Sequence, residues 1–335
     1  MRSNLIISTG ESDDNVEDVD YLLITSELRN FVIEPVHHNQ RLDLALADLV
    51  PELSRSYLQQ LVSIGAVFVR GILKNKASTK LKAGDLCTIE IRPTPQSQAF
   101  KPEKISLDIV FEDEHLMVIN KPVGLVVHPA PGNWSGTLLN GLLAHDKVFK
   151  DLPRAGIVHR LDKDTSGLMV VAKSRGVMNE LIKSIAAREV HREYLALAHH
   201  AWSGPPCKVV EASIGRDPRN RLRMAVVDLT RSPGKIAKTE FSVLSSVELG
   251  SLVKCTLHTG RTHQIRVHMA SISHPLVGDS LYGGKSVGVM TRQALHAYRL
   301  AFRHPVKQEL LTFNAQMPFD LLSALDFWNL SYNKI

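Results

Sequence analysis

The chain has 335 residues, of which 44% are hydrophobic and 22% are charged, as is usual for a globular protein with one large and one small domain. No apolar run approaches the roughly 18 residues of a transmembrane helix, and the N-terminus lacks the basic start and apolar core of a signal peptide. The three cysteines lie far apart, which argues against a structural zinc site and a disulfide framework. We therefore expect a soluble, cytoplasmic protein.

The net charge of +6 is unevenly distributed along the chain. Residues 1–34 contain eight acidic and two basic residues, a balance of −6, so the remainder carries +12. A basic body favours a polyanionic partner, because phosphate backbones attract lysine and arginine side chains. Charge alone is equally compatible with a positively biased surface that binds no nucleic acid.

Composition divides the chain into four segments. Residues 1–35 are predicted to form a flexible acidic extension, because apolar residues are sparse there, although 21–33 could add a strand. Residues 36–92 have the pattern of a small module, and 93–103, with three prolines, that of a linker. Residues 104–325 then read as one large unit.

The segment 36–92 predicts two short helices followed by strands. Leu42, Leu46 and Leu49 recur at helical spacing, Ser54 is placed to cap a second helix, and Gly65 is placed to end it. The runs AVFVRG and LCTIEIR are strand-like, and the basic stretch LKNKASTKLKAGD separates them. This order resembles the S4 RNA-binding module, a small α/β domain, which implies that the segment grips RNA. The expected phosphate contacts are Arg41, Arg55, Lys74, Lys76, Lys80 and Lys82. Taken singly, each is more often an ordinary surface charge, and the cluster carries the prediction.

The large unit mixes strand-like runs with amphipathic stretches. LMVIN, GLMVVAKS, YLALAH and LVKCTLHT are typical of strands, whereas MNELIKSIAAR and HQIRVHMASIS are typical of helices. The two kinds do not alternate as in βαβ repeats. We therefore predict an α+β fold with a large mixed, mostly antiparallel sheet. A further basic run, GRDPRNRLRM, predicts a surface hairpin.

The stretch GIVHRLDKDTSGLMVVAKS, residues 156–174, carries the strongest candidate for chemistry. A turn-prone polar segment precedes a buried strand, which places Asp162 on a loop at a sheet edge with His159 and Arg160 beside it. Aspartates in such segments are more often turn residues than catalytic ones. Asp164 lies nearer the turn and is the better candidate for hydrogen bonds to its backbone.

Four segments, in order, resemble the RluA/RluD family of RNA pseudouridine synthases. HRLDKDTSGL is similar to the catalytic motif of that family. INKPVGLVVHPAPGNWSGTLLNGLL, HREYLAL and LHTGRTHQIRVHMASISHPLVGDSLYGG are similar to its other conserved segments. Together with the S4-like module, the resemblance covers about 37–315, and it implies the pseudouridine synthase fold and activity.

The resemblance also implies roles for particular side chains. Asp162 matches the essential carboxylate, and Arg160 the arginine that fills the space left by a flipped uridine. Tyr194 matches the tyrosine that stacks on the target base and assists its proton transfer. Arg266 matches the arginine that pairs with the aspartate, with Arg261 as the alternative.

The implied reaction needs little machinery. The N1–C1′ bond of uridine breaks, the base turns, and it rejoins the sugar through C5. No oxidation and no ATP are involved, and the sequence contains no phosphate-binding loop or dinucleotide fingerprint, so we expect no cofactor. One carboxylate, charged beside an arginine, would either attack C1′ or remove the C2′ proton, and the sequence leaves both routes open.

Histidines are numerous but do not predict a metal site. His258, His263 and His268 recur every five residues, which matches neither a helical pair nor a common zinc spacing. His128 and His159 lie in the matched segments, and we expect them to position their neighbours.

Two other classes of function, an RNA-binding protein without catalysis and a glycosidase, fit the sequence less well. A pure RNA-binding or ribosome-assembly protein would have no need of Asp162, Tyr194 and the two arginines. A glycosidase would need two carboxylates flanking the bond, which Asp162 and Asp164, two apart on one loop, do not suggest. The appended S4-like module favours 23S ribosomal RNA as the substrate, with transfer RNA as the alternative. We expect a monomer.

Overall fold

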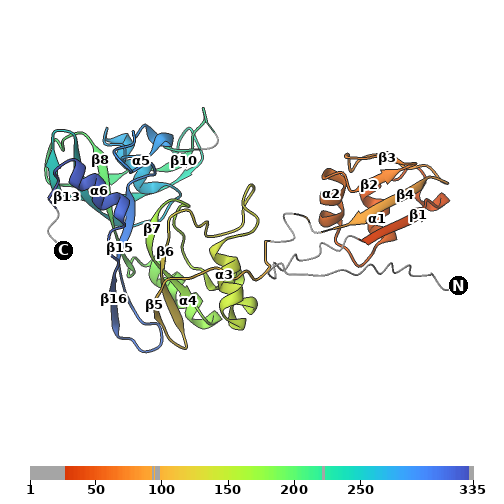
Figure 1. Cartoon of the computed structure of the whole chain (residues 1–335), viewed down its shortest axis with the longest axis horizontal. Coiled ribbons are helices and arrows are strands. Elements are labelled where there is room, and N and C mark those ends of the chain that lie inside the picture. Colours follow the sequence, from red (N-terminus) through yellow and green to blue (C-terminus); the bar gives the residue numbers. More distant parts are fainter. Residues whose placement is uncertain (1–26, 93, 95–98, 221–222, 332–335) are drawn as a thin grey trace, which may run out of the picture. The chain divides into compact units, whose positions relative to one another are not determined.

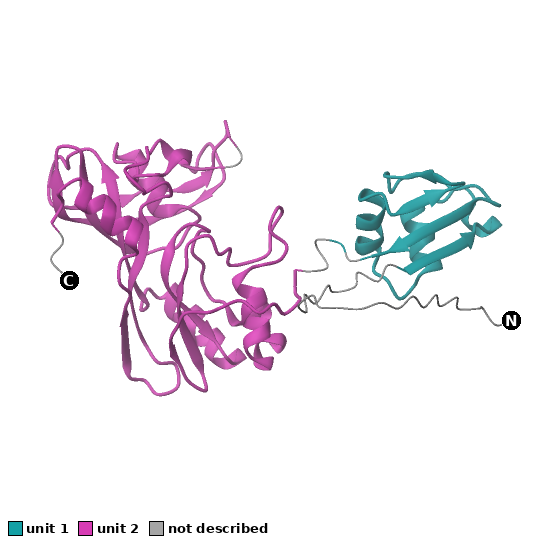
Figure 2. Cartoon of the chain, in the orientation of Figure 1, with its two compact units in different colours: residues 1–97 teal, residues 98–335 magenta. Residues whose placement is uncertain are grey.

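The computed structural model describes residues 27–92, 94, 99–220 and 223–331. The chain divides into two compact units, residues 1–97 and 98–335 (Figure 2). The division falls inside the proline-containing segment 93–103, of which residues 93 and 95–98 lie outside the described part. Each unit has its own apolar core and is described by itself.

The small unit packs two helices on a four-stranded antiparallel sheet with the order β1-β4-β2-β3 (Figure 1). Its strands are β1 (Glu27–Val32), β2 (Val67–Val69), β3 (Ile72–Leu73) and β4 (Leu86–Ile91), and its helices are η1 (Pro35–His37), α1 (Leu42–Leu49) and α2 (Arg55–Ser63). The Ser54 hydroxyl caps α2 by accepting a hydrogen bond from Tyr57 N at 3.3 Å. Gly65, just past that helix, has a left-handed backbone with φ +76°.

The first strand lies in the part of the predicted acidic extension, residues 21–33, where the sequence allowed a strand. Residues 27–32, which were assigned to the extension, pair along their whole length with β4. Pairing satisfies the hydrogen-bonding groups that the edge of β4 would otherwise expose, which a count of apolar residues does not reveal. The rest of the predicted extension, residues 1–26, lies outside the described residues.

The large unit is built on a nine-stranded sheet with the order β5-β6-β7-β15-β8-β14-β13-β9, in which β16 also pairs with β15 (Figure 1). Only the pairing of β7 with β15 is parallel among the described strands. The prediction of an α+β fold with a large mixed, mostly antiparallel sheet is confirmed. The strands are β5 (Ile109–Glu112), β6 (Leu116–Lys121), β7 (Ser166–Ala172), β8 (His191–His199), β9 (Cys207–Glu211), β13 (Lys238–Val247), β14 (Gly250–Leu257), β15 (Leu295–Arg303) and β16 (Leu310–Asn314).

A second, three-stranded sheet has the order β11-β10-β12. Its strands are β10 (Ile214–Arg216), β11 (Met224–Val226) and β12 (Gly234–Lys235). The antiparallel pairing of β10 with β11 confirms the hairpin predicted for the basic run, whose residues 221–222 lie outside the described part.

Helices cover both faces of the nine-stranded sheet. One face packs against α3 (Leu138–His145), α5 (Gln264–Ser271), η3 (Lys147–Asp151) and η4 (Pro153–Gly156). Two other apolar clusters contain α4 (Arg175–Ala186) and α6 (Phe319–Phe327). The remaining short helix is η5 (Ser280–Tyr282). Because side chains alternate along a strand, Tyr194 of β8 faces the same core as α3 and α5, whereas Leu195 faces α6. No helix among the described residues is long and apolar enough to cross a membrane.

A glycine permits the parallel contact between β7 and β15. Gly167 has φ +114°, and a Cβ atom there would collide with the carbonyl oxygen of Ala297 on β15. We predict that Gly167→Ala lowers the free energy of unfolding by about 2–4 kcal/mol, because both strain and overlap are introduced. Denaturant unfolding would measure it.

Gly176, near the start of α4, is the matched control, because a Cβ atom there would meet nothing within 4 Å. Gly176→Ala is expected to be neutral or stabilising by up to about 1 kcal/mol. Equal effects of the two substitutions would contradict the close approach of β7 and β15.

Candidate active site

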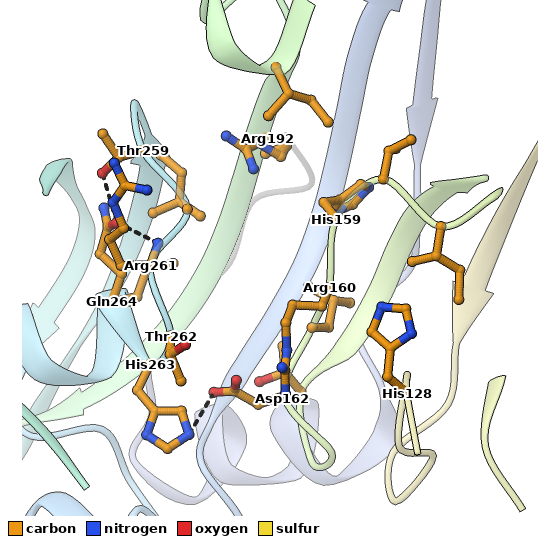
Figure 3. Close-up of a pocket in the computed structure, with 18 of the residues that line it drawn as sticks. His128, His159, Arg160, Asp162, Arg192, Thr259, Arg261, Thr262, His263 and Gln264 are labelled. Atoms are coloured by element: carbon orange, nitrogen blue, oxygen red, sulfur yellow. Dashed lines mark hydrogen bonds and ion pairs between the residues drawn. The ribbon is translucent and has the colours of Figure 1, made fainter. Parts of the chain in front are cut away.

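A cavity of about 960 Å³ lies on the Tyr194 face of the nine-stranded sheet, within the large unit. Its walls come from the loop 157–162, from β8 and from the segment 257–266 (Figure 3). Among the described residues, the lining includes six arginines and a single carboxylate, Asp162. The cavity is therefore strongly positive, which suits a polyanionic ligand.

Asp162 is placed by the loop that enters β7. Ile157 forms a bridge with Val171 of β7, and the Asp162 carbonyl closes the following turn by accepting a hydrogen bond from Thr165 N at 3.1 Å. The turn was expected to involve Asp164, but the main chain of Asp162 itself closes it. The Asp162 side chain is left to line the cavity.

A buried lysine ties this loop to its neighbour. Lys121, only 1% exposed, donates hydrogen bonds from Nζ to the carbonyl oxygens of Pro122, Leu125 and Lys163, at 2.7, 3.0 and 2.9 Å. Burial lowers the pKa of Lys121 to about 8, against the opposing effect of the carboxylates of Asp164 and Asp162. Lys121 therefore lies beneath the loop and holds Lys163, the residue next to Asp162.

Arg266 on α5 joins two carboxylates. Its Nε and Nη2 donate to Asp279 Oδ2 and Oδ1 at 2.7 and 2.9 Å, and its Nη1 donates to Asp162 Oδ2 at 3.1 Å. The guanidinium carbon also lies 5.0 Å from the centre of the Tyr282 ring. Burial would lower the pKa of Arg266, but the Asp279 and Asp162 carboxylates raise it above its ordinary value. Because the guanidinium is planar, the two bonds to Asp279 fix the direction in which Nη1 meets Asp162.

His263 approaches the same carboxylate from the start of α5. Its Nε2 lies 3.9 Å from Asp162 Oδ2 (Figure 3). Its Nδ1 is 2.8 Å from the Tyr282 hydroxyl. That hydroxyl accepts a hydrogen bond from Met224 N, so its own proton is available for Nδ1, which places the ring proton of His263 on Nε2. Burial lowers the pKa of His263, although Asp162 opposes the shift.

All these contacts use Oδ2 of Asp162, and Oδ1 has no hydrogen-bond partner among the described residues. Tyr194 lines the same cavity and is buried, and burial raises the pKa of its hydroxyl to about 12. The phenol is therefore protonated at neutral pH. The structure thus brings an oriented carboxylate and a neutral tyrosine ring into one cavity.

The other residues predicted for the site divide into two groups. Arg160 and His159 line the cavity, whereas Arg261, also in its lining, donates from Nε to the Ile236 carbonyl at 3.1 Å. Arg266, and not Arg261, therefore pairs with Asp162. His159 Nε2 accepts a hydrogen bond from Val170 N at 3.1 Å, and burial lowers the pKa of His159 to about 3, so the ring stays neutral.

The predicted contacts in the small unit have partners of their own. Arg41 and Arg55 both donate to the buried carboxylate of Asp43, at 3.0 and 2.7 Å for the shortest bonds. Lys80 donates from Nζ to the Asn39 carbonyl at 3.1 Å. Lys76 and Lys80 are exposed, and Lys74 is partly buried.

No group of three or more histidine, cysteine, aspartate or glutamate side chains among the described residues could hold a metal ion. His258 Nε2 lies 3.5 Å from Glu240 Oε2. His268 Nε2 donates to the Ala212 carbonyl at 3.0 Å, and its Nδ1 accepts from the Thr239 hydroxyl at 2.9 Å, so these rings serve local contacts.

Sequence reasoning missed Asp279. Asp279 lies in a turn, which Gly284 N closes by donating a hydrogen bond to the Asp279 carbonyl. Its side chain, 2% exposed, is nevertheless the partner of Arg266. The only sequence signal was its place within a matched segment.

Similarity to known proteins covers the residues of this site. The sequence model of the family described as RNA pseudouridylate synthase matches residues 115–271, which include Asp162, Tyr194 and Arg266. The chain is also 48% identical over 298 residues to the ribosomal large subunit pseudouridine synthase D of Neisseria meningitidis serogroup A, covering 85% of this chain and 78% of that protein. The chain belongs to the RNA pseudouridylate synthase family.

Further relatives support the assignment. The protein of the same description from Escherichia coli O157:H7 is 42% identical over 301 residues, covering 86% of this chain and 90% of that protein. Among solved structures, human RNA pseudouridylate synthase domain containing 4 is similar at a TM-score of 0.53 and 27% identity, covering 67% of this chain and 94% of that chain. The predicted family is confirmed, and the chain is an RNA-modifying isomerase. The family match begins at residue 115 and leaves the small unit unassigned.

The contact between Asp279 and Arg266 leads to a prediction. Asp279→Asn replaces one of the two accepting oxygens with an amide, so the guanidinium loses its fixed direction toward Asp162. We expect the single-turnover rate of pseudouridine formation to fall about 100-fold, as for a misplaced catalytic group, with little change in RNA affinity. Tritium release from RNA labelled at C5 of uridine would measure the rate.

Asp164→Asn is the matched control, because the Asp164 carboxylate does not line the cavity. That variant should react at nearly the wild-type rate. A wild-type rate for Asp279→Asn would show that Asp162 is positioned without Asp279.

Proposed function

We propose that this enzyme converts specific uridines of 23S, large-subunit ribosomal RNA to pseudouridine, acting as a cytoplasmic monomer. The orientation of Asp162 is the observation that supports the proposed chemistry. Asp162 Oδ2 accepts a hydrogen bond from Arg266, and Oδ1, which has no partner among the described residues, lies in a positive cavity. The large-subunit target is supported by the relatives named above, whose descriptions specify that RNA.

Asp162 acts on the sugar of the target uridine. Two routes use a single carboxylate oxygen. In one, Oδ1 attacks C1′ and the electron pair of the N1–C1′ bond passes to the base. In the other, Oδ1 removes the C2′ proton and a glycal forms as that bond breaks. In both, the base turns and C5 bonds to C1′; this displaces Oδ1 from C1′ in the first route, and in the second Asp162 returns the proton to C2′. The C5 proton then leaves and N1 gains a proton, so the product is an isomer of the substrate.

Tyr194 stacks on the target base, and Arg160 occupies the space that the base leaves. The buried ring of Tyr194 offers a flat apolar face beside Asp162, on which an extruded uracil can stack. The Tyr194 hydroxyl, whose pKa is raised to about 12, is positioned to accept or relay the C5 proton only after a partner deprotonates it, so stacking is its first role. Arg160, exposed at the cavity wall, fills the gap that the uridine leaves.

The small unit serves as an S4-like RNA grip. Asp43 orients the guanidinium groups of Arg41 and Arg55, whose side chains remain 41% and 48% exposed. Their outer edges, with Lys74, Lys76 and Lys80 of the loop after β3, present charge to a phosphate backbone.

We predict that Asp162→Ala abolishes pseudouridine formation, because no other carboxylate lines the cavity within the described residues. Purified protein would be incubated with large-subunit ribosomal RNA labelled with tritium at C5, and both tritium release and pseudouridine would be followed. RNA affinity should remain near that of the wild type. Tritium release that persisted in Asp162→Ala would refute the role of this carboxylate.

A second prediction concerns the small unit. Replacing Lys74, Lys76 and Lys80 together by alanine should weaken RNA binding and reduce the slope of log affinity against log salt by about 2, since each phosphate contact contributes about 0.7–0.9. The single-turnover rate at saturating RNA should change less than the affinity. Lys183→Ala, which removes a lysine paired with Glu180 on α4, is the control and should leave the slope unchanged. An unchanged slope in the triple variant would exclude these lysines as phosphate contacts.

A further inference from the structure

Arg192 on β8 is a buried charge without a hydrogen-bond or ion-pair partner among the described residues. The residue is 6% exposed, its Nε has no hydrogen-bond partner, and no hydrogen bond or ion pair joins its guanidinium to any described residue. Burying a charge without a protein partner is costly, and an anion bound in the cavity would offset that cost.

The guanidinium faces the cavity of Asp162. Arg192 lines that cavity and lies two residues before Tyr194 on the same face of β8. Burial lowers the pKa of His159, and the charge of Arg192 lowers it further. The same charge lowers the pKa of Tyr194 and so opposes burial, which raises it. In Figure 3, Arg192 lies at the end of the drawn cavity away from Asp162 and His263.

Space for the guanidinium is provided by a glycine in the facing wall. A Cβ atom on Gly260 would lie 3.0 Å from Arg192 Nη1, so any larger residue at that position would press on the guanidinium. The other arginines of the cavity differ. Arg266 is occupied by two carboxylates, and Arg154, Arg160, Arg188 and Arg261 are exposed. Among the described arginines of the cavity, Arg192 is therefore the one that is both buried and without a carboxylate partner.

We infer that Arg192 binds a phosphodiester of the RNA strand next to the uridine that stacks on Tyr194. A guanidinium offers a fork of donors that matches two phosphate oxygens, and such charge-assisted pairs are strongest where water is excluded. The inference rests on the proposed function for the presence of RNA. The phosphate fixes the strand at one end of the cavity while Asp162 reacts at the other.

The first test measures the binding of a single-stranded oligouridylate at several salt concentrations. Arg192→Gln should weaken binding about 10-fold or more, as expected for loss of a charge-assisted pair. It should also reduce the slope of log affinity against log salt by about 0.7, the value for one phosphate contact on a single strand. Arg303→Gln is the matched control: it removes an exposed arginine of β15, outside the cavity lining, and should leave the slope unchanged.

Two further variants separate phosphate binding from a structural role. Arg192→Lys keeps the charge but not the fork, so it should restore most of the salt slope with weaker affinity than the wild type. Gly260→Ala keeps Arg192 and crowds Nη1, so it should weaken binding less than Arg192→Gln. Unfolding temperatures would identify any variant that fails to fold, and Gly260→Ala then decides the question.

Two outcomes overturn the inference: a wild-type salt slope for folded Arg192→Gln, or wild-type affinity for Gly260→Ala. Failure of the proposed function would appear differently, as absence of pseudouridine in large-subunit RNA treated with the wild-type chain. The binding test needs no reaction, so each claim can fail alone.

Discussion

Arg266 donates hydrogen bonds to the carboxylates of Asp279 and Asp162, and the geometry of the site depends on this pairing. The fork of two hydrogen bonds to Asp279 uses Nε and Nη2, which leaves Nη1 directed at Asp162. A buried guanidinium is costly unless it is fully paired, so the two aspartates and the Tyr282 ring are needed together. The arginine stabilises Asp162 in one orientation and leaves one of its oxygens available for chemistry.

The sheet supplies the remaining geometry. Alternation along β8 puts Arg192 and Tyr194 on the face that carries the cavity, and Lys121 at the end of β6 holds the loop that carries Asp162. Catalytic and binding groups therefore stand on rigid strands, or on a loop held at both ends, so the cavity can keep its shape when RNA arrives.

Local features were predictable from sequence, and distant pairings were not. Ser54 and Gly65 mark the ends of α2 because capping depends on neighbouring residues, and the buried strand β7 follows from its apolar run. Asp162 was found through its motif. The contacts of Asp279 and Lys121 were not predicted, because their partners, Arg266 and Lys163, lie 13 and 42 residues away in the chain. Residues 21–33 were recognised as able to form a strand, but its pairing with β4 could not be predicted from that segment alone.

The most direct test of this account is a double-mutant cycle on the single-turnover rate with Asp279→Asn, Arg266→Gln and the two combined. If Asp279 acts only through Arg266, the double variant should be about as slow as Arg266→Gln alone, because the second change removes a contact already lost. Losses that multiply in the double variant would contradict the account, since Asp279 would then act on the reaction by a route that does not pass through Arg266.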